Sequence, residues 1–310
     1  MSIESAFTRV SVTMKYTGKS INDLQTLSLI LGSKPAELGY LSLNMEKNVR
    51  TYNIPKKHTP TEKRAITAPS EKLKRIQREI KDHLLDNYTL QPYVYGLGGN
   101  TLRDHANLHK GTKVLVQLDI RDFYPSISHA LVFKMWVEKF GFSADVARVL
   151  TKLTTMNGGL MQGFPTSSHI AAIVAEDLTA ALDKHCRNNS MSFSQYVDDF
   201  NISGNNINYR DVFKLVVTTG REYGLSIKRK KTRVNSKHVG KKITGVALTN
   251  QSTRATREVR QRAIRALKDL ASQPEDEYFQ KRVAGYAGFL KHLKSRDGKK
   301  YKKQVNNIRS

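Results

Sequence analysis

The chain has 310 residues, of which 39% are hydrophobic and 25% charged, a composition that suits a globular protein with a sizeable core. Lys and Arg number 52 against 27 Asp and Glu, and the net charge of +25 favours a nucleic-acid partner over a small neutral substrate. A merely solvated basic surface, or attraction to anionic lipid, would leave the same composition. The single cysteine, Cys186, excludes an intramolecular disulfide and a cysteine-built zinc cage, which fits a reduced, cytoplasmic setting. With no apolar leader and no run of about eighteen apolar residues, we expect neither secretion nor a membrane span.

Short helices are expected in the first fifty residues. Ser20 is a candidate cap for a helix whose apolar face comprises Ile21, Leu24, Leu27 and Ile30. Gly32 is a candidate stop for this helix, and Pro35 a candidate start for the next one.

A basic stretch follows, with eleven Lys and Arg against three Glu in residues 47–81. Its segments TYNIPKK and KRAITAPS are predicted to be extended, and residues 71–86 are predicted to form a helix. Residues 113–120, KVLVQLDI, are dense in aliphatic and β-branched side chains, which predicts a buried strand with Asp119 near its far end.

Two helices are predicted next, over residues 128–140 and 143–156. After a glycine-rich break, one long helix is expected from residue 167 to about residue 187. The segment MSFSQYVDDFNISG then predicts a hairpin whose turn carries Asp198 and Asp199.

A helix over residues 209–223 and a short strand over residues 225–227 complete the order strand, helix, hairpin, helix, strand. This is the order of a split βαβ, ferredoxin-like sheet, in which the end of the first strand lies beside the hairpin turn. The segment KKITGVALT is expected to form one further strand. Basic helices over residues 253–272 and 275–294 are expected to precede a polar tail.

Three carboxylates, those of Asp119, Asp198 and Asp199, would therefore meet at one edge of the sheet. Clustered anions are unfavourable unless a proton or a cation compensates them. Oxygen ligands of this kind suit Mg²⁺, and two such ions about 3.5–4 Å apart can support in-line phosphoryl transfer. The alternative is structural, because Asp-Asp pairs are common in turns.

The whole set of motifs resembles the reverse transcriptases. YVDD (residues 196–199) is similar to their Y-x-D-D signature, and LDIRDFYPSI to their first catalytic motif, in which an aromatic residue follows the Asp. Further similarities, in chain order, are carried by IPKK, RAITAPSEKLKRIQ, YGLGGN, LMQGFPTSS, GLSIKRKKT and ITGVAL. The resemblance runs from about residue 52 to residue 248. Five of these motifs in order, LDIRDFYPSI, LMQGFPTSS, YVDD, GLSIKRKKT and ITGVAL, are far more specific together than any one alone.

Within that superfamily the chain resembles the retron and group II intron enzymes, and the retron type most closely. HANLH (residues 105–109) stands where retron enzymes carry N-A-x-x-H, and ITG where they carry V-T-G. The chain departs from the family pattern at three positions: His105 replaces Asn, Ser168 stands where Pro is frequent, and Lys228 where Asn is usual.

The resemblance implies an α+β, right-hand polymerase fold with a ferredoxin-like palm, fingers and a helical thumb. The expected domains are an N-terminal helical extension (1–50), fingers (51–112), a palm (113–240) that contains a fingers insertion at about 128–156, and a palm–thumb hinge strand with the helical thumb (241–310).

The resemblance also implies roles at the metal site. Asp119 and Asp198 would be the main ligands of two Mg²⁺ ions, with Mn²⁺ as a possible substitute. Asp199 would assist, and the carbonyl of Ile120 would add a ligand.

For the incoming deoxynucleotide, Tyr124 would lie under the sugar and collide with a 2′-hydroxyl; the alternative is that Phe123 and Tyr124 are core aromatics. Arg64 and Lys63 would reach the triphosphate, although surface solvation is the alternative for Lys63. Gln162 and Gly163 would form a loop whose backbone closely approaches the base pair, which favours glycine. Lys231 would neutralise or protonate the departing pyrophosphate.

Basic residues of the last third would bind the nucleic-acid backbone, giving a steep salt dependence. The candidates are Lys228, Arg229, Lys230, Arg233, Lys291 and Lys294.

The activity implied is that of an RNA-directed DNA polymerase that copies a structured noncoding RNA, which serves as template and primer, into short DNA. The product would be a branched RNA–DNA molecule, with a role in defence against phage and a separate effector protein. Two alternatives stay open: another defence-associated or group II intron-like reverse transcriptase, and an inactive RNA-binding scaffold.

Overall fold

A computed structural model describes residues 15–55, 61–228, 232–236, 240–249, 252–293 and 296–309. The chain forms two compact units. The first unit comprises Met1–Pro92, Ile120–Ala180 and Leu215–Ile227, and the second Tyr93–Asp119, Ala181–Lys214 and Lys228–Ser310. Within the described residues, no helix has both the length and the apolar character needed to cross a membrane.

The first unit opens with two short helices, α1 (Leu24–Ile30) and α2 (Pro35–Leu43). The expectation that Ser20 caps α1 is wrong, because Asp23 accepts the cap hydrogen bond from the Thr26 N–H. The Ser20 hydroxyl instead donates to the carbonyl of Gly141, a partner that lies far along the chain. The predicted start at Pro35 is confirmed.

A 3₁₀ turn (Glu46–Asn48) leads into an antiparallel ribbon, in which all seven residues of β1 (Val49–Pro55) pair with β2 (Lys63–Pro69). This confirms the extended segments predicted there within the described residues, while Lys56 and Lys57 of TYNIPKK lie outside them. Ser70 then caps α3 (Glu71–Ile80) by accepting from the Leu73 N–H, and the helix continues as a π turn, η3 (Lys81–Leu85).

The next helices of the first unit are α5 (Phe123–Ser126), α6 (His129–Glu138), α7 (Ala144–Thr154) and α8 (Ser167–Val174). A small hairpin of β5 (Thr155–Met156) and β6 (Gly159–Leu160) lies between α7 and α8 in the chain. The helices predicted over residues 128–140 and 143–156 are thus confirmed, each capped by a serine hydroxyl at its first turn.

The single long helix predicted from residue 167 is wrong, because the helix is interrupted at Ala175. Ala175 has a ψ of 0°, and α9 (Glu176–Asn188) begins at the next residue. Glu176 is buried and accepts hydrogen bonds from residues distant in sequence, such as Tyr88. Local sequence carries no sign of such partners.

The second unit contains a five-stranded sheet in the order β3-β7-β8-β4-β9. Its strands are β3 (Val94–Tyr95), β4 (Val114–Asp119), β7 (Ser192–Tyr196), β8 (Asp199–Gly204) and β9 (Arg233–Asn235). The order β7-β8-β4-β9 is that of the predicted split βαβ sheet, with antiparallel pairing throughout.

The fourth strand of that motif was predicted at the wrong place. Residues 225–227 contribute only an isolated bridge between Ile227 and Ile120, whereas Arg233–Asn235 pairs with β4 as β9. The helix before it, α10 (Tyr209–Gly220), ends in a 3₁₀ turn (Arg221–Tyr223), which agrees with the prediction.

The last third of the second unit differs from prediction in three ways. KKITGVALT forms two strands, β10 (Lys242–Ile243) and β11 (Val246–Leu248), because the chain reverses at Thr244 and Gly245, both at positive φ. Residues 253–255 form β12 (Thr253–Ala255) and not the start of a helix. A third helix replaces the expected polar tail.

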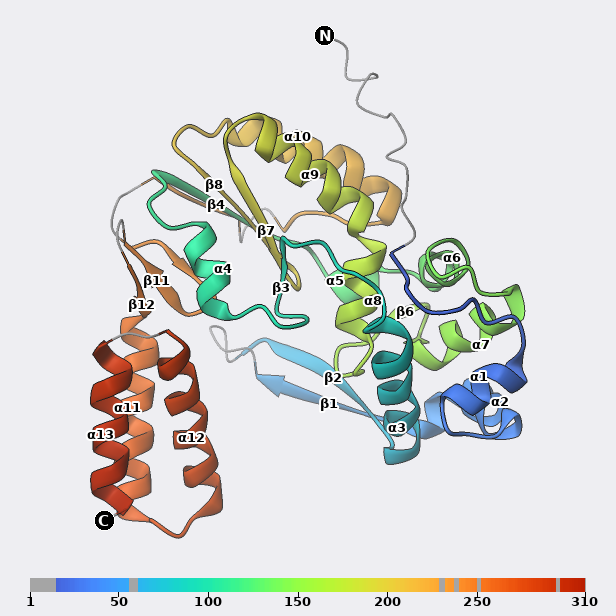
Figure 1. Ribbon diagram of the computed structural model, residues 1–310, viewed down its shortest axis with the longest axis horizontal. Coiled ribbons are helices and arrows are strands. Elements are labelled where there is room, and N and C mark those ends of the chain that lie inside the picture. Colours follow the sequence, from blue (N-terminus) through green and yellow to red (C-terminus); the bar gives the residue numbers. More distant parts are fainter. Residues whose placement is uncertain are drawn as a thin grey trace. The chain divides into compact units, whose positions relative to one another are not determined.

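Three helices form a bundle in this unit: α11 (Arg257–Ser272), α12 (Glu277–His292) and α13 (Arg296–Arg309) (Figure 1). On α13, Tyr301 and Val305 are buried four residues apart, on one face of the helix. The Tyr301 hydroxyl donates to the Ala263 carbonyl at 3.1 Å. Buried residues of the three helices, such as Leu267 and Leu290, form an apolar core. The helix α4 (Leu102–Leu108) contributes Ala106 to this core.

Candidate active site

Two of the three predicted carboxylates lie on neighbouring strands. Asp119 ends β4, Asp199 begins β8, and the two residues are opposite each other in the antiparallel register. Side chains of directly opposed residues project from the same face of a sheet, with Cβ atoms about 4.5–5.5 Å apart. Both residues are half-buried, so that their carboxylates retain access to water.

The third carboxylate lies in the hairpin turn between β7 and β8. Tyr196 pairs with Asp199, which leaves Val197 and Asp198 as a two-residue turn. Val197 has a φ of 55°, a strained conformation for a β-branched residue. The buried Gln195 amide donates to the Val197 carbonyl at 3.1 Å and thereby stabilises the turn.

The side chains of this turn and strand end offer carboxylate oxygens, and this chemistry fits a hard cation such as Mg²⁺. Ile120 follows Asp119 directly in the chain. The backbone bonds that frame its bridge to Ile227 belong to its neighbours Asp119 and Arg121, so the Ile120 carbonyl takes no part in that ladder. Among the described residues, no three His, Cys, Asp or Glu side chains are already close enough to enclose a metal ion. The full ligand set therefore stays a prediction.

A buried histidine pair supports the hairpin from α4. His105 Nε2 and His109 Nε2 lie 2.8 and 2.7 Å from the Ser194 hydroxyl of β7, and His109 Nδ1 lies 2.8 Å from the Ser203 hydroxyl of β8. Burial lowers the pKa of His105 to about 4, and burial together with His105 lowers the pKa of His109 to about 3. Both rings are therefore neutral at pH 7.

The His105 ring also stacks on the tyrosine of the YVDD turn. Its centroid is 5.5 Å from that of Tyr196, at an interplanar angle of 7°, and 4.7 Å from that of Tyr95. Sequence reasoning left the role of these histidines open. Their spacing of four residues, which places both on one face of a helix, is the signal that could have suggested a shared contact.

In the first unit, Tyr124 lies on α5, the single turn that follows Asp122 in the left-handed conformation (φ 43°). Phe123 is buried, whereas Tyr124 is only half-buried. The Tyr124 hydroxyl lies 2.8 Å from the Ser168 hydroxyl on α8. The core-aromatic alternative thus holds for Phe123 but does not account for Tyr124.

The predicted phosphate contacts, Lys63 and Arg64, are both exposed on β2. Because they are adjacent on a strand, their side chains project from opposite faces of the ribbon. Ile66, on the face of Arg64, lies near Gly163, and Thr67, on the face of Lys63, is buried and donates its hydroxyl to Met161 Sδ at 3.8 Å. Both faces of β2 therefore contact residues 161–163, and the roles of Arg64 and Lys63 both stay predictions.

That loop is attached to β2 through its backbone. The Thr67 N–H donates to the Gln162 carbonyl at 2.8 Å. Gly163 has a φ of 119°, and a Cβ atom added there would lie 2.5 Å from the Thr67 carbonyl oxygen. The structure shows Gly163 in close approach to the β2 backbone, and its predicted close approach to a ligand stays a prediction.

Comparison with known proteins identifies the family. The protein-family model described as Reverse transcriptase (RNA-dependent DNA polymerase) matches residues 54–265, more than half of the chain. The chain belongs to the reverse transcriptase family. The right-hand polymerase fold predicted from the motifs is therefore confirmed.

The relatives of this reverse transcriptase include retron enzymes. The retron Se72 reverse transcriptase of Salmonella heidelberg (strain 579083-10) is 29% identical over 261 residues, which cover 82% of this chain and 68% of the relative. The retron Ec86 reverse transcriptase of Escherichia coli is 24% identical over 243 residues, covering 77% and 75% respectively. A solved telomerase from Candida albicans is 13% identical with a TM-score of 0.48, covering 88% of this chain and 61% of that one. The sequence matches confirm an RNA-directed DNA polymerase similar to the retron type.

The predicted nucleic-acid contacts of the reverse transcriptase are only partly described. Lys228 donates its backbone N–H to the Asp119 carbonyl at 2.8 Å. Arg233 is exposed on β9, and Lys291 is exposed in the last turn of α12. The remaining candidates, Arg229, Lys230, Lys231 and Lys294, lie outside the described residues.

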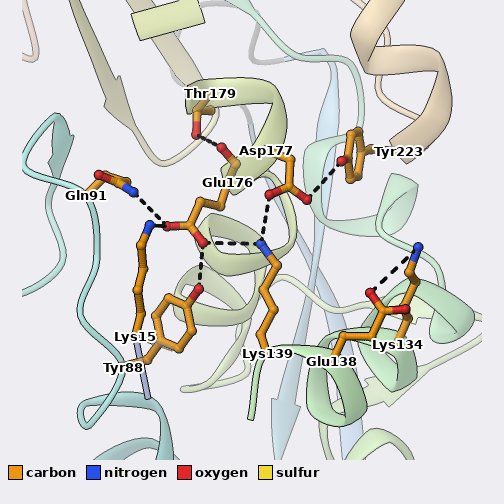
Figure 2. Close-up of polar contacts among 10 residues, drawn as sticks. All are labelled: Lys15, Tyr88, Gln91, Lys134, Glu138, Lys139, Glu176, Asp177, Thr179 and Tyr223. Carbon is orange, nitrogen blue, oxygen red and sulfur yellow. Dashed lines mark hydrogen bonds and ion pairs between the residues drawn. The ribbon is translucent and has the colours of Figure 1, made fainter. Parts of the chain in front are cut away.

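Sequence reasoning missed a polar cluster in the first unit of the reverse transcriptase, centred on Glu176 (Figure 2). Its carboxylate accepts from Tyr88 at 2.6 Å, from Lys139 and Gln91 at 3.2 Å each, and from Lys15. Burial alone would raise the pKa of Glu176, but the two lysines and Tyr88 outweigh it and lower the pKa. The charge therefore links segments that are distant in sequence.

Proposed function

We propose that Asp119, Asp198 and Asp199 hold two Mg²⁺ ions, or Mn²⁺ in their place, at the polymerisation site of this reverse transcriptase. The observation that carries the proposal is the opposed register of Asp119 and Asp199, with Asp198 in the adjoining turn. Bound divalent ions would lower the pKa of the attacking hydroxyl and neutralise charge on the phosphates. A chain that kept the fold only to bind RNA would gain nothing from these mutually repelling groups.

The residues of the chain would do the positioning. Asp119 and Asp198 would be the main ligands, Asp199 would assist, and the Ile120 carbonyl would add an oxygen. The reaction joins the primer hydroxyl to the α-phosphorus of a dNTP and releases pyrophosphate, and Lys231 is the candidate to neutralise or protonate the leaving group.

We further propose that the first unit carries the contacts to the incoming dNTP. Arg64 presents an exposed, forked donor pair that suits the triphosphate. Gln162 and Gly163 form a loop fixed to the same ribbon. The half-buried Tyr124 ring would collide with a 2′-hydroxyl and so select deoxynucleotides. Lys63, beside Arg64 on β2, would also reach the triphosphate.

By similarity to retron enzymes, the template and primer would be one structured noncoding RNA, and the product a short DNA joined to it. Lys228, Arg233 and Lys291, with Arg229, Lys230 and Lys294, would bind the RNA backbone. A cytoplasmic role in defence against phage, with a separate effector protein, is the biological setting that we propose.

Sequencing the nucleic acid that copurifies with the protein tests the retron assignment. One defined RNA joined covalently to a short DNA is the expected result. Unlinked or heterogeneous RNA would favour another defence-associated or intron-like reverse transcriptase. A matched preparation of Asp198→Asn should carry the RNA without the DNA, because it keeps the fold but loses the metal site.

A further inference from the structure

Ser168 is one of the positions at which this chain departs from its family pattern, which often has proline there. In the structure, the Ser168 side chain contacts Tyr124. Ser168 lies in the first turn of α8, and its hydroxyl is 2.8 Å from the hydroxyl of Tyr124 on α5. A proline at position 168 has no hydroxyl and could not make this hydrogen bond.

The backbone that carries Tyr124 is already fixed. The Ser126 N–H donates to the Asp122 carbonyl at 2.8 Å, and the Ile127 N–H to the Tyr124 carbonyl at 3.0 Å. Arg121 donates its N–H to the Ser226 carbonyl at 2.7 Å. Movement of the Tyr124 ring is therefore confined to its side-chain torsions.

A ring excludes a 2′-hydroxyl sterically only while it stays in one rotamer. Rotation about the side-chain torsions to another staggered rotamer would remove the ring from the sugar position. A hydrogen bond at the far end of the ring opposes that rotation most directly, because the hydroxyl moves farthest. The Ser168 hydroxyl is placed at that end.

Ser168 is itself well placed to hold the ring. It is half-buried, and the preceding residue, Ser167, is fixed by donating its hydroxyl to the Met161 carbonyl at 2.7 Å. The helix α8 continues into a fully buried face that includes Ile170 and Ile173. The hydrogen-bond partner of the Tyr124 hydroxyl therefore lies on a rigid element.

We propose that Ser168 is a positioning residue for sugar selection, which holds the Tyr124 ring against the 2′-position of the incoming nucleotide. The inference rests on the proposed role of Tyr124 in dNTP selection. Ser168 does not touch the nucleotide and acts only through Tyr124.

The test compares the selectivity of nucleotide incorporation, defined as kcat/KM for a dNTP divided by kcat/KM for the matching rNTP. It uses the full chain with its RNA template, and the variants Ser168→Ala, Tyr124→Phe and the double variant. Each single variant removes one hydroxyl of the pair. Ser168→Thr keeps the hydroxyl, and Ser42→Ala is the control, because it removes a helical hydroxyl that bonds to the Gly39 carbonyl.

We expect Ser168→Ala and Tyr124→Phe each to lower the selectivity by about two- to tenfold, the range of one neutral hydrogen bond. The double variant should equal either single variant, because both remove the same bond. Most of the change should come from improved kcat/KM for the rNTP. Ser168→Thr and Ser42→Ala should keep the wild-type selectivity.

Tyr124→Ala separates the inference from the proposed function. If Tyr124→Ala admits rNTPs while Ser168→Ala leaves the selectivity unchanged, Ser168 has no positioning role and the steric role of Tyr124 stands. If the effects of Ser168→Ala and Tyr124→Phe are additive, the two hydroxyls act independently and the inference is also overturned. Unchanged selectivity in Tyr124→Ala would overturn the steric role together with the inference.

Discussion

Asp119 on β4 lies directly opposite Asp199 on β8, the residue that follows Asp198 in the YVDD turn. Two strands that are separated by some eighty residues of sequence thus bring carboxylates to one face of one sheet end. The position is unfavourable for the free anions and suited to bound cations. The strained Val197 and the buried histidines behind β7 indicate that the surrounding structure holds this turn in place.

The buried histidines predict a pH dependence of stability. The pKa is about 4 for His105 and about 3 for His109, against the ordinary 6.5. Between each lowered pKa and 6.5, the unfolded chain therefore binds more protons than the folded chain. The free energy of unfolding should therefore fall as the pH drops from about 6.5 towards 4, by about 1.4 kcal/mol per pKa unit and group. Urea unfolding at several pH values measures it.

His109→Gln should flatten that pH dependence, whereas the exposed His292→Asn should leave it as in the wild type. A slope that is unchanged in His109→Gln would show that other groups titrate.

Glu176→Gln should destabilise the first unit by about 3 kcal/mol, because it removes the buried anion that Lys15 and Lys139 share and leaves the poorly exposed Lys139 only the exposed Asp177. The pKa of Glu176 is lowered in the fold, so its contribution is present at neutral pH and is lost as the pH falls below its ordinary value of 4.5. Thermal unfolding at pH 7 measures the loss.

Asp177→Asn is the matched control, because Asp177 bonds to the same Lys139 but its side chain is 56% exposed. Asp177→Asn should lower the free energy of unfolding by less than about 1 kcal/mol. Equal losses for the two variants would argue against a special role for the buried carboxylate.

Gly163→Ala should impair nucleotide incorporation, because the added Cβ would lie 2.5 Å from the Thr67 carbonyl oxygen and force the Gln162 loop off β2. A rise in KM for the dNTP of about tenfold or more is expected from such a displacement. Gly39→Ala on α2, where an added Cβ meets open space, should retain wild-type kinetics. Wild-type KM in Gly163→Ala would separate this loop from nucleotide binding.

Lys291→Gln should weaken RNA binding to a similar degree for all sequences, if Lys291 contacts the phosphate backbone. The slope of log K against log salt should fall by about one unit. Filter binding of the full chain across a salt series measures the slope, with the exposed Lys34→Gln as the charge-matched control. An unaltered slope would remove Lys291 from the interface.

The sequence predicted those elements whose determinants are local. Helices with serine caps, such as the one that begins after Ser128, and the hairpin around Asp198 and Asp199 were predicted correctly. The helix break at Ala175 was missed because it accompanies the burial of Glu176 among partners that are remote in sequence. The third bundle helix was missed because dense lysines hid the pair of apolar positions at Tyr301 and Val305.

The site was predictable to a similar extent. The pairing of Asp119 with the YVDD turn followed from strand order, since the order fixes which strand ends are neighbours. The contact between Tyr124 and Ser168 and the histidine support of the hairpin depend on side-chain geometry between distant segments. No periodicity or motif spacing encodes such contacts.

Single-nucleotide incorporation on an RNA template, measured with increasing Mg²⁺, tests the metal site most directly. The wild-type chain should incorporate a dNTP only with a divalent ion present, and Asp198→Asn should lose at least about a thousandfold in rate at every Mg²⁺ concentration. Asp122→Asn removes the same charge at an exposed residue whose left-handed backbone suits Asn, and it should behave as the wild type. Extension by a folded Asp198→Asn protein at the wild-type rate would contradict the assignment of the polymerisation site to these carboxylates.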